Sequence, residues 1–172
     1  LFAKFLLHGD CSYDYKNQLN SNSERLIDGE YVVIHPGAGR SDKLWSIDEW
    51  ALVINYLINC GIKVVLTGKG NSDKLIAQKL TNQCLGIQDL VNKLNWVDLV
   101  SVIYGAKFVI SVDTVSGHVA ALNNIKLISL FSSDLNSLIW FPYGNQVNVF
   151  SPVSTVAAAD IIQYIQSKLI VK

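Results

Sequence analysis

The 172-residue sequence contains no methionine and only three cysteines and three prolines. A chain without methionine is not a complete primary translation product, so we expect a fragment or the ordered part of something longer. The cysteines, Cys11, Cys60 and Cys84, are odd in number and lack C-x-x-C spacing, which favours a reducing compartment and small buried apolar roles. His, Cys, Asp and Glu show no metal-ligand spacing, so no metal site is predicted.

An excess of charge of either sign is also missing, because 14 Lys and Arg residues balance 14 Asp and Glu residues. Nucleic-acid binders usually have a clustered basic excess, so that class of protein is not expected. The longest apolar run is Trp50 to Ile54, far below the roughly 18 residues of a membrane span. The apolar start Leu1 to Leu7 is too short for a signal peptide. With 50% hydrophobic and 16% charged residues, the sequence indicates a globular domain with a large core.

The sequence does contain a regular alternation of strand and helix patterns from Tyr31 onward. Ser46 and Glu49 have the spacing of a capping box, and Gly61 ends the helix that follows. Strands are predicted over residues 31–35, 63–67, 107–112 and 126–131, and helices over residues 46–60, 71–82, 96–104, 114–122 and 156–169.

This order of elements predicts an α/β fold, with an open, doubly wound parallel sheet of the Rossmann-like type over residues 31–172. The strands are near-continuous apolar runs, as expected when helices cover both faces of a sheet. Residues 1–30 have no comparable apolar period, and we expect a linker or N-terminal extension there. In such sheets ligands bind beyond the carboxyl ends of the strands, so the loops that follow the strands are the candidate sites.

The loop of residues 35–43 combines Gly37 and Gly39 with the cations Arg40 and Lys43. Glycines let a backbone approach a ligand closely, and free N–H groups at a helix start favour an anion such as phosphate. The loop fits neither the Walker pattern nor G-x-G-x-x-G. An ordinary glycine turn with a solvated lysine is the alternative interpretation.

The loop of residues 111–118 ends a strand in Asp113 and Thr114 and starts a helix at once. Its N–H groups predict a second anion site, where Asp113 would accept hydrogen bonds from sugar hydroxyls and His118 would lie one turn into the helix. The alternative is a simple N-cap at Asp113 and a core-edge histidine at His118.

The loop of residues 67–73 ends another strand and places Asp73 in the first turn of a helix. A carboxylate there could bind vicinal hydroxyls such as those of a ribose, or it could only cap the helix. His35 is predicted to complete its strand, and Trp45, Trp50, Trp96 and Trp140 are predicted core or interface anchors.

These loops together resemble the motifs of the heptosyltransferases, glycosyltransferase family 9, which act in lipopolysaccharide inner-core synthesis. Residues 34–46 resemble the motif H-P-G-A…K-x-W-P, and residues 107–122 resemble D-[TS]-G-x-x-H-x-A-A. Residues 89–94 are similar to D-L-x-G-x-x-x-L, and residues 130–144 to L-F-G-P-T…P-x-G. The four motifs occur in the family's order and spacing over about residues 31–150.

The resemblance implies a GT-B fold of two Rossmann-like domains, of which the matched motifs belong to the C-terminal, donor-binding one. It implies an ADP-heptose-type nucleotide sugar as donor, a lipid A–core acceptor, and a cytoplasmic location at the periphery of the inner membrane. The sequence itself offers no acidic pair that would obviously hold Mg²⁺, so we predict that donor binding is independent of metal. The family's catalytic base lies in the N-terminal domain. We therefore expect that domain to be missing here and this chain alone to be inactive.

The resemblance also implies which residues contact the donor. Lys43 would contact its phosphate or sugar, Asp73 the ribose and Asp113 the sugar, while N–H groups from Thr114 onward would hold the diphosphate beside His118. The predicted donor-binding set is Ala38, Gly39, Lys43, Asp73, Asp113, Thr114, Val115 and His118.

Four positions depart from the family pattern: Val91, Val115 and Ser132 stand where it prefers glycine, and Asp73 is shorter than its glutamate. These departures leave two alternatives, a GT-B enzyme or epimerase for another nucleotide sugar, and a non-catalytic GT-B interaction module. A nicotinamide-dependent enzyme is disfavoured because G-x-G-x-x-G is absent.

Overall fold

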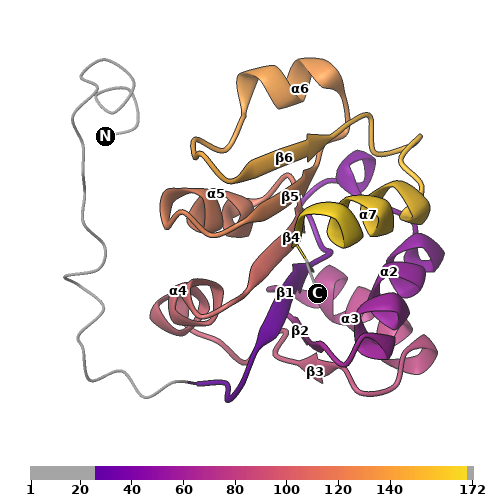
Figure 1. Ribbon diagram of the computed structural model, residues 1–172, viewed down its shortest axis with the longest axis vertical. Helices are drawn as coiled ribbons and strands as arrows, with labels where there is room; N and C mark the ends of the chain where they lie inside the picture. Colours follow the sequence, from indigo (N-terminus) through magenta and orange to yellow (C-terminus); the bar gives the residue numbers. More distant parts are fainter. Residues whose placement is uncertain (1–25, 170–172) are drawn as a thin grey trace.

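The computed structural model describes residues 26–169, which are arranged around a parallel sheet of strand order β3-β2-β1-β4-β5-β6 (Figure 1). The predicted linker over residues 1–30 falls mostly on residues 1–25, which lie outside the described range. The order reverses at β1, as in a doubly wound sheet, so the predicted fold class is confirmed. The strands are β1 Tyr31–His35, β2 Lys63–Leu66, β3 Gln88–Asp89, β4 Phe108–Val112, β5 Leu127–Leu130 and β6 Val147–Phe150.

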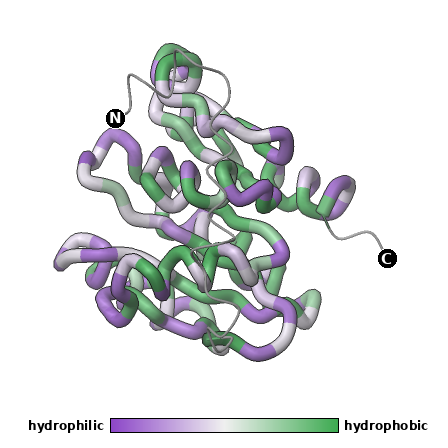
Figure 2. Tube along the Cα trace, turned by 90° about the vertical axis from the view of Figure 1, so that its left-hand side faces the viewer, coloured by the Kyte–Doolittle hydropathy of each residue, from purple (hydrophilic) through white to green (hydrophobic). Residues whose placement is uncertain are grey.

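Helices cover both faces of the sheet. Alternate side chains of each strand point to opposite faces, and both faces carry buried apolar side chains that the helices cover. In β1, Val32 and Ile34 face the core beneath the helices of residues 47–59, 71–83 and 158–164, whereas Tyr31 and Val33 face the core beneath the helices of residues 96–104 and 115–122. The central strands are mainly hydrophobic, and hydrophilic stretches lie in outer loops and helices (Figure 2). The helices are η2 Ser41–Lys43, α2 Ile47–Asn59, α3 Asn71–Gln83, α4 Trp96–Tyr104, α5 Val115–Leu122, α6 Asp134–Ile139, α7 Ala158–Tyr164 and the π-helical η3 Ile165–Leu169.

The predicted capping box at the start of α2 is wrong. The Ser46 side chain makes no capping hydrogen bond, although Ser46 is the N-cap residue. The Glu49 carboxylate instead accepts a hydrogen bond from the backbone N–H of Ala158, the first residue of α7. The carboxylate therefore joins two helices that pack side by side, and it stabilises the N-terminus of α7 rather than that of its own helix.

Within residues 26–169, no helix is both long enough and apolar enough to cross a bilayer. The four predicted strands and five predicted helices are present, with shifts of one or two residues at several ends and the last helix turning π-helical from Ile165. The elements that sequence patterning missed are β3, α6, β6 and the short η2.

Candidate functional site

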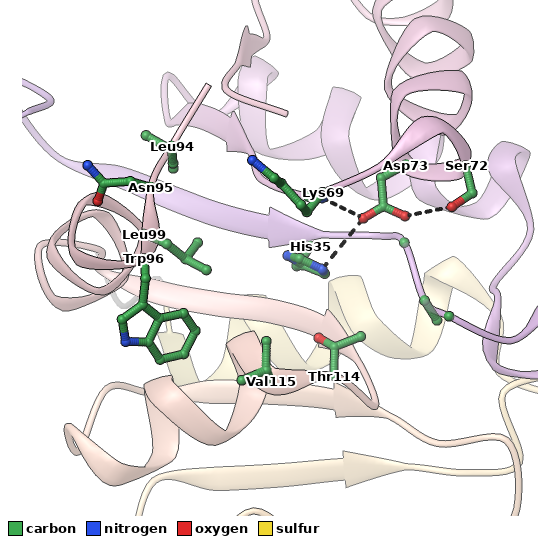
Figure 3. A pocket seen from close by; sticks show the side chains of 14 residues that line it. His35, Lys69, Ser72, Asp73, Leu94, Asn95, Trp96, Leu99, Thr114 and Val115 are labelled. Atoms are coloured by element: carbon green, nitrogen blue, oxygen red, sulfur yellow. Dashed lines mark hydrogen bonds and ion pairs between the residues drawn. The ribbon is translucent and has the colours of Figure 1, made fainter. Parts of the chain in front are cut away.

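A cavity of about 460 Å³ opens where β1, β2 and β4 end (Figure 3). It lies at the carboxyl edge of the sheet, as predicted for a doubly wound fold. Its lining residues are His35, Gly37, Ala38, Gly39, Gly68, Lys69, Ser72, Asp73, Leu94, Asn95, Trp96, Leu99, Thr114 and Val115.

The turns after β1 and β4 face each other across this cavity. Gly37, Ala38 and Gly39 line one side, and Thr114 and Val115 at the start of α5 line another. Thr114 is the N-cap residue of α5, but its hydroxyl makes no capping bond and lies instead 3.0 Å from the Ser111 hydroxyl. The first N–H groups of α5 therefore have no side-chain cap, which leaves a helix N-terminus that favours an anion.

Val115 stands where the family pattern has glycine, and the structure shows how the loop accommodates it. In the described part of the chain, the non-glycine residues with positive φ are Asn92 and Asn124, so Val115 adopts ordinary helical geometry as the first residue of α5. A β-branched side chain is therefore not strained there. Val115 also lines the cavity.

Lys43 and Asp113 form an ion pair beside the cavity rather than lining it. Lys43 Nζ lies 2.6 Å from Asp113 Oδ2, and the side chains are 24% and 6% exposed. Lys43 ends η2, and Asp113 directly follows β4, so the pair joins the two turns. The sequence predicted Lys43 as a cation facing an anion, and the structure shows that Asp113 already partly neutralises it.

His118 lies near the same ion pair and is also outside the cavity lining. The pKa of His118 is lowered overall, mainly by burial. The negative charge of Asp113 partly opposes this effect, and the positive charge of Lys43 adds to it. Of the eight predicted donor-binding residues, the structure thus places Ala38, Gly39, Asp73, Thr114 and Val115 on the cavity, and Lys43, Asp113 and His118 beside it.

Asp73 is a buried carboxylate in the cavity wall, in the first turn of α3. Its Oδ2 accepts a hydrogen bond from the backbone N–H of Lys69 at 2.9 Å, one residue before the N-cap residue Gly70. The carboxylate therefore holds the turn that precedes α3 and does not cap the helix itself, so the alternative interpretation of Asp73 as a helix cap is wrong. Two glycines pack against the carboxylate. A Cβ on Gly37 would lie 2.1 Å from Oδ1, and a Cβ on Gly68 would lie 2.7 Å from Oδ2. Both glycines therefore let the backbone approach the carboxylate closely, and a Cβ at either position would force the Asp73 side chain to shift.

His35 lines the cavity, although the sequence pattern predicted only the end of a strand. Its Nδ1 lies 2.9 Å from the Ser116 hydroxyl and 3.1 Å from the Thr67 hydroxyl, and its Nε2 lies 4.0 Å from Asp73 Oδ2. Burial lowers the pKa of His35 from 6.5 to about 4, although the negative charge of Asp73 raises it. The imidazole is therefore neutral at pH 7.

An apolar wall formed by Leu94, Trp96 and Leu99 closes the side of the cavity nearest α4 (Figure 3). Trp96 was predicted to be a core or interface anchor, but its side chain is 55% exposed and lines the cavity. The position of Trp96 at the first residue of a predicted helix was the signal that could have found it. In the range 26–169, no group of three or more His, Cys, Asp or Glu side chains is arranged to hold a metal ion.

Comparison with known proteins matches residues 8–162 to glycosyltransferase family 9 (heptosyltransferase). The chain is 30% identical over 144 residues to lipopolysaccharide heptosyltransferase 3 of Escherichia coli K12, covering 82% of this chain and 41% of that protein. The solved structure of E. coli heptosyltransferase WaaC with ADP aligns with a TM-score of 0.80 at 26% identity, covering 97% of this chain and 54% of that one.

A second structure of E. coli heptosyltransferase WaaC, with ADP-2-deoxy-2-fluoro heptose, aligns with a TM-score of 0.77 at 26% identity, covering 93% of this chain and 49% of that one. The chain thus spans about half the length of these solved structures, and less than half of the curated relative.

Proposed function

The chain belongs to glycosyltransferase family 9, the heptosyltransferases, and from this premise we propose that residues 31–172 form the donor-binding domain of an enzyme that adds heptose to the lipopolysaccharide core. The observation that supports this proposal most is the cavity shared by the turns after β1 and β4. Its volume of about 460 Å³ is within the range of small-molecule sites, roughly 300–1,000 Å³.

The chemistry of the cavity walls matches the parts of a nucleoside diphosphate. The glycine turn and the uncapped N-terminus of α5 at Thr114 suit the diphosphate, because backbone N–H groups and the helix dipole favour negative charge. The Asp73 carboxylate suits ribose hydroxyls. The apolar wall at Leu94, Trp96 and Leu99 suits the base, which is planar and largely apolar on its faces.

In the proposed reaction, an acceptor hydroxyl gives up its proton to the catalytic base and attacks the anomeric carbon of the donor sugar, and the bond to the diphosphate breaks. Negative charge then develops on the departing nucleoside diphosphate. Fixed N–H groups of α5 would stabilise this charge without reorganisation. The Lys43 ammonium, shared with Asp113, would add to this stabilisation. Asp113, paired with Lys43 at 2.6 Å, would hold the ammonium in place and offer a carboxylate to the sugar hydroxyls, with His118 nearby.

The catalytic base and the acceptor site are proposed to lie in a further, N-terminal domain, as the family resemblance implies. The chain alone would then bind donor without transferring sugar. The proposed acceptor is the lipid A–core, reached at the periphery of the inner membrane from the cytoplasm. Donor binding is proposed to be independent of metal.

Thermal unfolding of the chain with ADP, GDP and UDP, each with and without EDTA, tests the proposal. We expect ADP to raise Tm most, because binding to the native state alone stabilises it, and we expect EDTA to leave the shift unchanged. A larger shift with GDP or UDP would indicate a GT-B domain for another nucleotide sugar. No shift with any nucleotide would favour a non-catalytic interaction module and contradict the proposal.

A further inference from the structure

The His35 ring lies where three loops meet at the cavity. Thr67 directly follows β2, Ser116 lies in the first turn of α5, and Asp73 lies in the first turn of α3. The Nδ1 atom lies within hydrogen-bond distance of both hydroxyls, and both hydroxyl residues are fully buried. The Nε2 atom points toward the Asp73 carboxylate across the cavity wall (Figure 3).

We propose that His35 is a donor-binding residue: the Asp73 carboxylate on one side and the two hydroxyls on the other hold its ring in the Nε2–H tautomer, which presents a hydrogen-bond donor beside the Asp73 acceptor for one sugar hydroxyl, that of the ribose. The sugar-hydroxyl part rests on the proposed function. The tautomer part does not, because it concerns only contacts within the chain.

The tautomer follows from the electrostatics around the ring. The ring is neutral at pH 7, because burial lowers its pKa to about 4, so a single nitrogen bears the proton. An unprotonated Nε2 would direct its lone pair at a carboxylate oxygen 4.0 Å away, which is repulsive. With the proton on Nε2, the single lone pair of Nδ1 is the acceptor that the hydroxyls of Ser116 and Thr67 share, and each of these hydroxyls has a proton to donate.

The separation of the pair explains what it would recognise. A distance of 4.0 Å between Nε2 and Oδ2 is too long for a direct hydrogen bond. A hydroxyl oxygen between them on the cavity side can accept from Nε2–H and donate to Oδ2 at ordinary distances of about 2.8 Å to each. Asp73 Oδ2 already accepts from the Lys69 N–H, and a carboxylate oxygen has capacity for a second bond.

Two matched substitutions separate the ring's two contacts. His35→Gln places an amide donor near the position of Nε2, so it should keep the contact toward Asp73. His35→Asn reaches only the position of Nδ1, so it should keep the hydroxyl contacts and lose the donor beside Asp73. We expect ADP to bind His35→Gln about tenfold more tightly than His35→Asn, a difference of roughly one good hydrogen bond.

The experiment measures ¹⁵N shifts of the histidine rings in the full 172-residue chain at pH 7, followed by ADP titrations of the chain and both variants. The His35 signals are those lost in His35→Gln. An Nε2–H tautomer is expected, and Ser116→Ala should raise the Nδ1–H fraction by removing the nearer hydroxyl. An Nδ1–H or doubly protonated ring, or equal ADP affinity in the Gln and Asn variants, would overturn the inference. Failure of the unmodified chain to bind ADP would instead contradict the proposed function and leave the tautomer result standing on its own.

Discussion

Two polar pairs lie near the glycine turn after β1, and they differ in charge, in separation and in whether they line the cavity. Lys43 and Asp113 are oppositely charged, 2.6 Å apart and outside the cavity lining. His35 and Asp73 are 4.0 Å apart, both line the cavity, and the imidazole is neutral at pH 7. Lys43 and Asp113 already bond to each other, whereas the His35 ring and the Asp73 carboxylate leave a hydrogen-bond donor and an acceptor available to a ligand.

A charged side chain near a site, such as Lys43, is therefore not fully available to a ligand when it is already paired. A diphosphate would have to share the Lys43 ammonium with Asp113, whose carboxylate is almost fully buried. The neutral His35 and the buried Asp73 need no such rearrangement. Substitutions and a pH titration test this difference, in order of decreasing expected effect.

Lys43→Ala should lower the free energy of unfolding by roughly 3 kcal/mol, because it leaves the buried Asp113 carboxylate without its partner. Adding Asp113→Asn should recover most of that loss, because the uncompensated charge is then removed. Urea unfolding of the single and double variants measures both effects. Equal stability of the single variant and the unmodified chain would show that water, rather than Lys43, compensates the charge of Asp113.

Lowering the pH from 7 to 5 should cost the chain about 2 kcal/mol of unfolding free energy through His35 alone. The folded pKa of His35 is about 4 and its ordinary value is 6.5. In this window the unfolded chain therefore binds a proton that the folded chain does not, and stability falls as pH falls. His35→Gln should lack this contribution while keeping the titration of every other group. Identical pH profiles of the two proteins by urea unfolding would contradict the low pKa.

Gly37→Ala should destabilise the chain by roughly 1–2 kcal/mol, because the new Cβ would overlap the Asp73 carboxylate and force it to shift. Gly39→Ala is the matched control. Gly39 lies in the same turn, has no positive φ, and a Cβ added to it would meet no atom within 4 Å. Thermal unfolding of both variants should show a lower Tm for Gly37→Ala only. A similar Tm for both would mean that Asp73 is not held against the turn.

Trp96→Ala should have the smallest effect on stability, within about 0.5 kcal/mol, because the side chain is 55% exposed. It should nevertheless weaken ADP binding about fivefold by removing apolar surface from the proposed base site. Trp140→Ala is the control, since Trp140 is 54% exposed and does not line the cavity. Calorimetric titration with ADP should separate the two variants, and equal affinities would remove Trp96 from the site.

The central elements of the fold could be predicted from the sequence because their signals are local. The bounds of β1 and α4 were predicted residue for residue, since each is a continuous apolar pattern between clear start and stop residues. The edge strand β6, with the sequence Val-Asn-Val-Phe, is only partly buried and has a weak pattern. Helix α6 has no fully buried residue, and Leu135, Leu138 and Ile139 are exposed, so no core-facing stripe marks it.

The contacts of the site depend on partners that are distant in sequence, which local patterns do not contain. Glu49 fits a capping box by spacing, yet its partner Ala158 lies 109 residues away. The hydroxyls that hold His35 are 32 and 81 residues away, at Thr67 and Ser116. The turns around Gly39 and Thr114 could be placed together only because a parallel sheet brings the carboxyl ends of its strands to one edge.

Whether one cavity between these two turns holds a nucleoside diphosphate can be decided by amide ¹H–¹⁵N spectra recorded during an ADP titration. We expect the signals of Gly39 and Val115 to shift together with a single Kd, because both residues line the same cavity. Shifts confined to one of the two turns, or to neither, would contradict a shared diphosphate site.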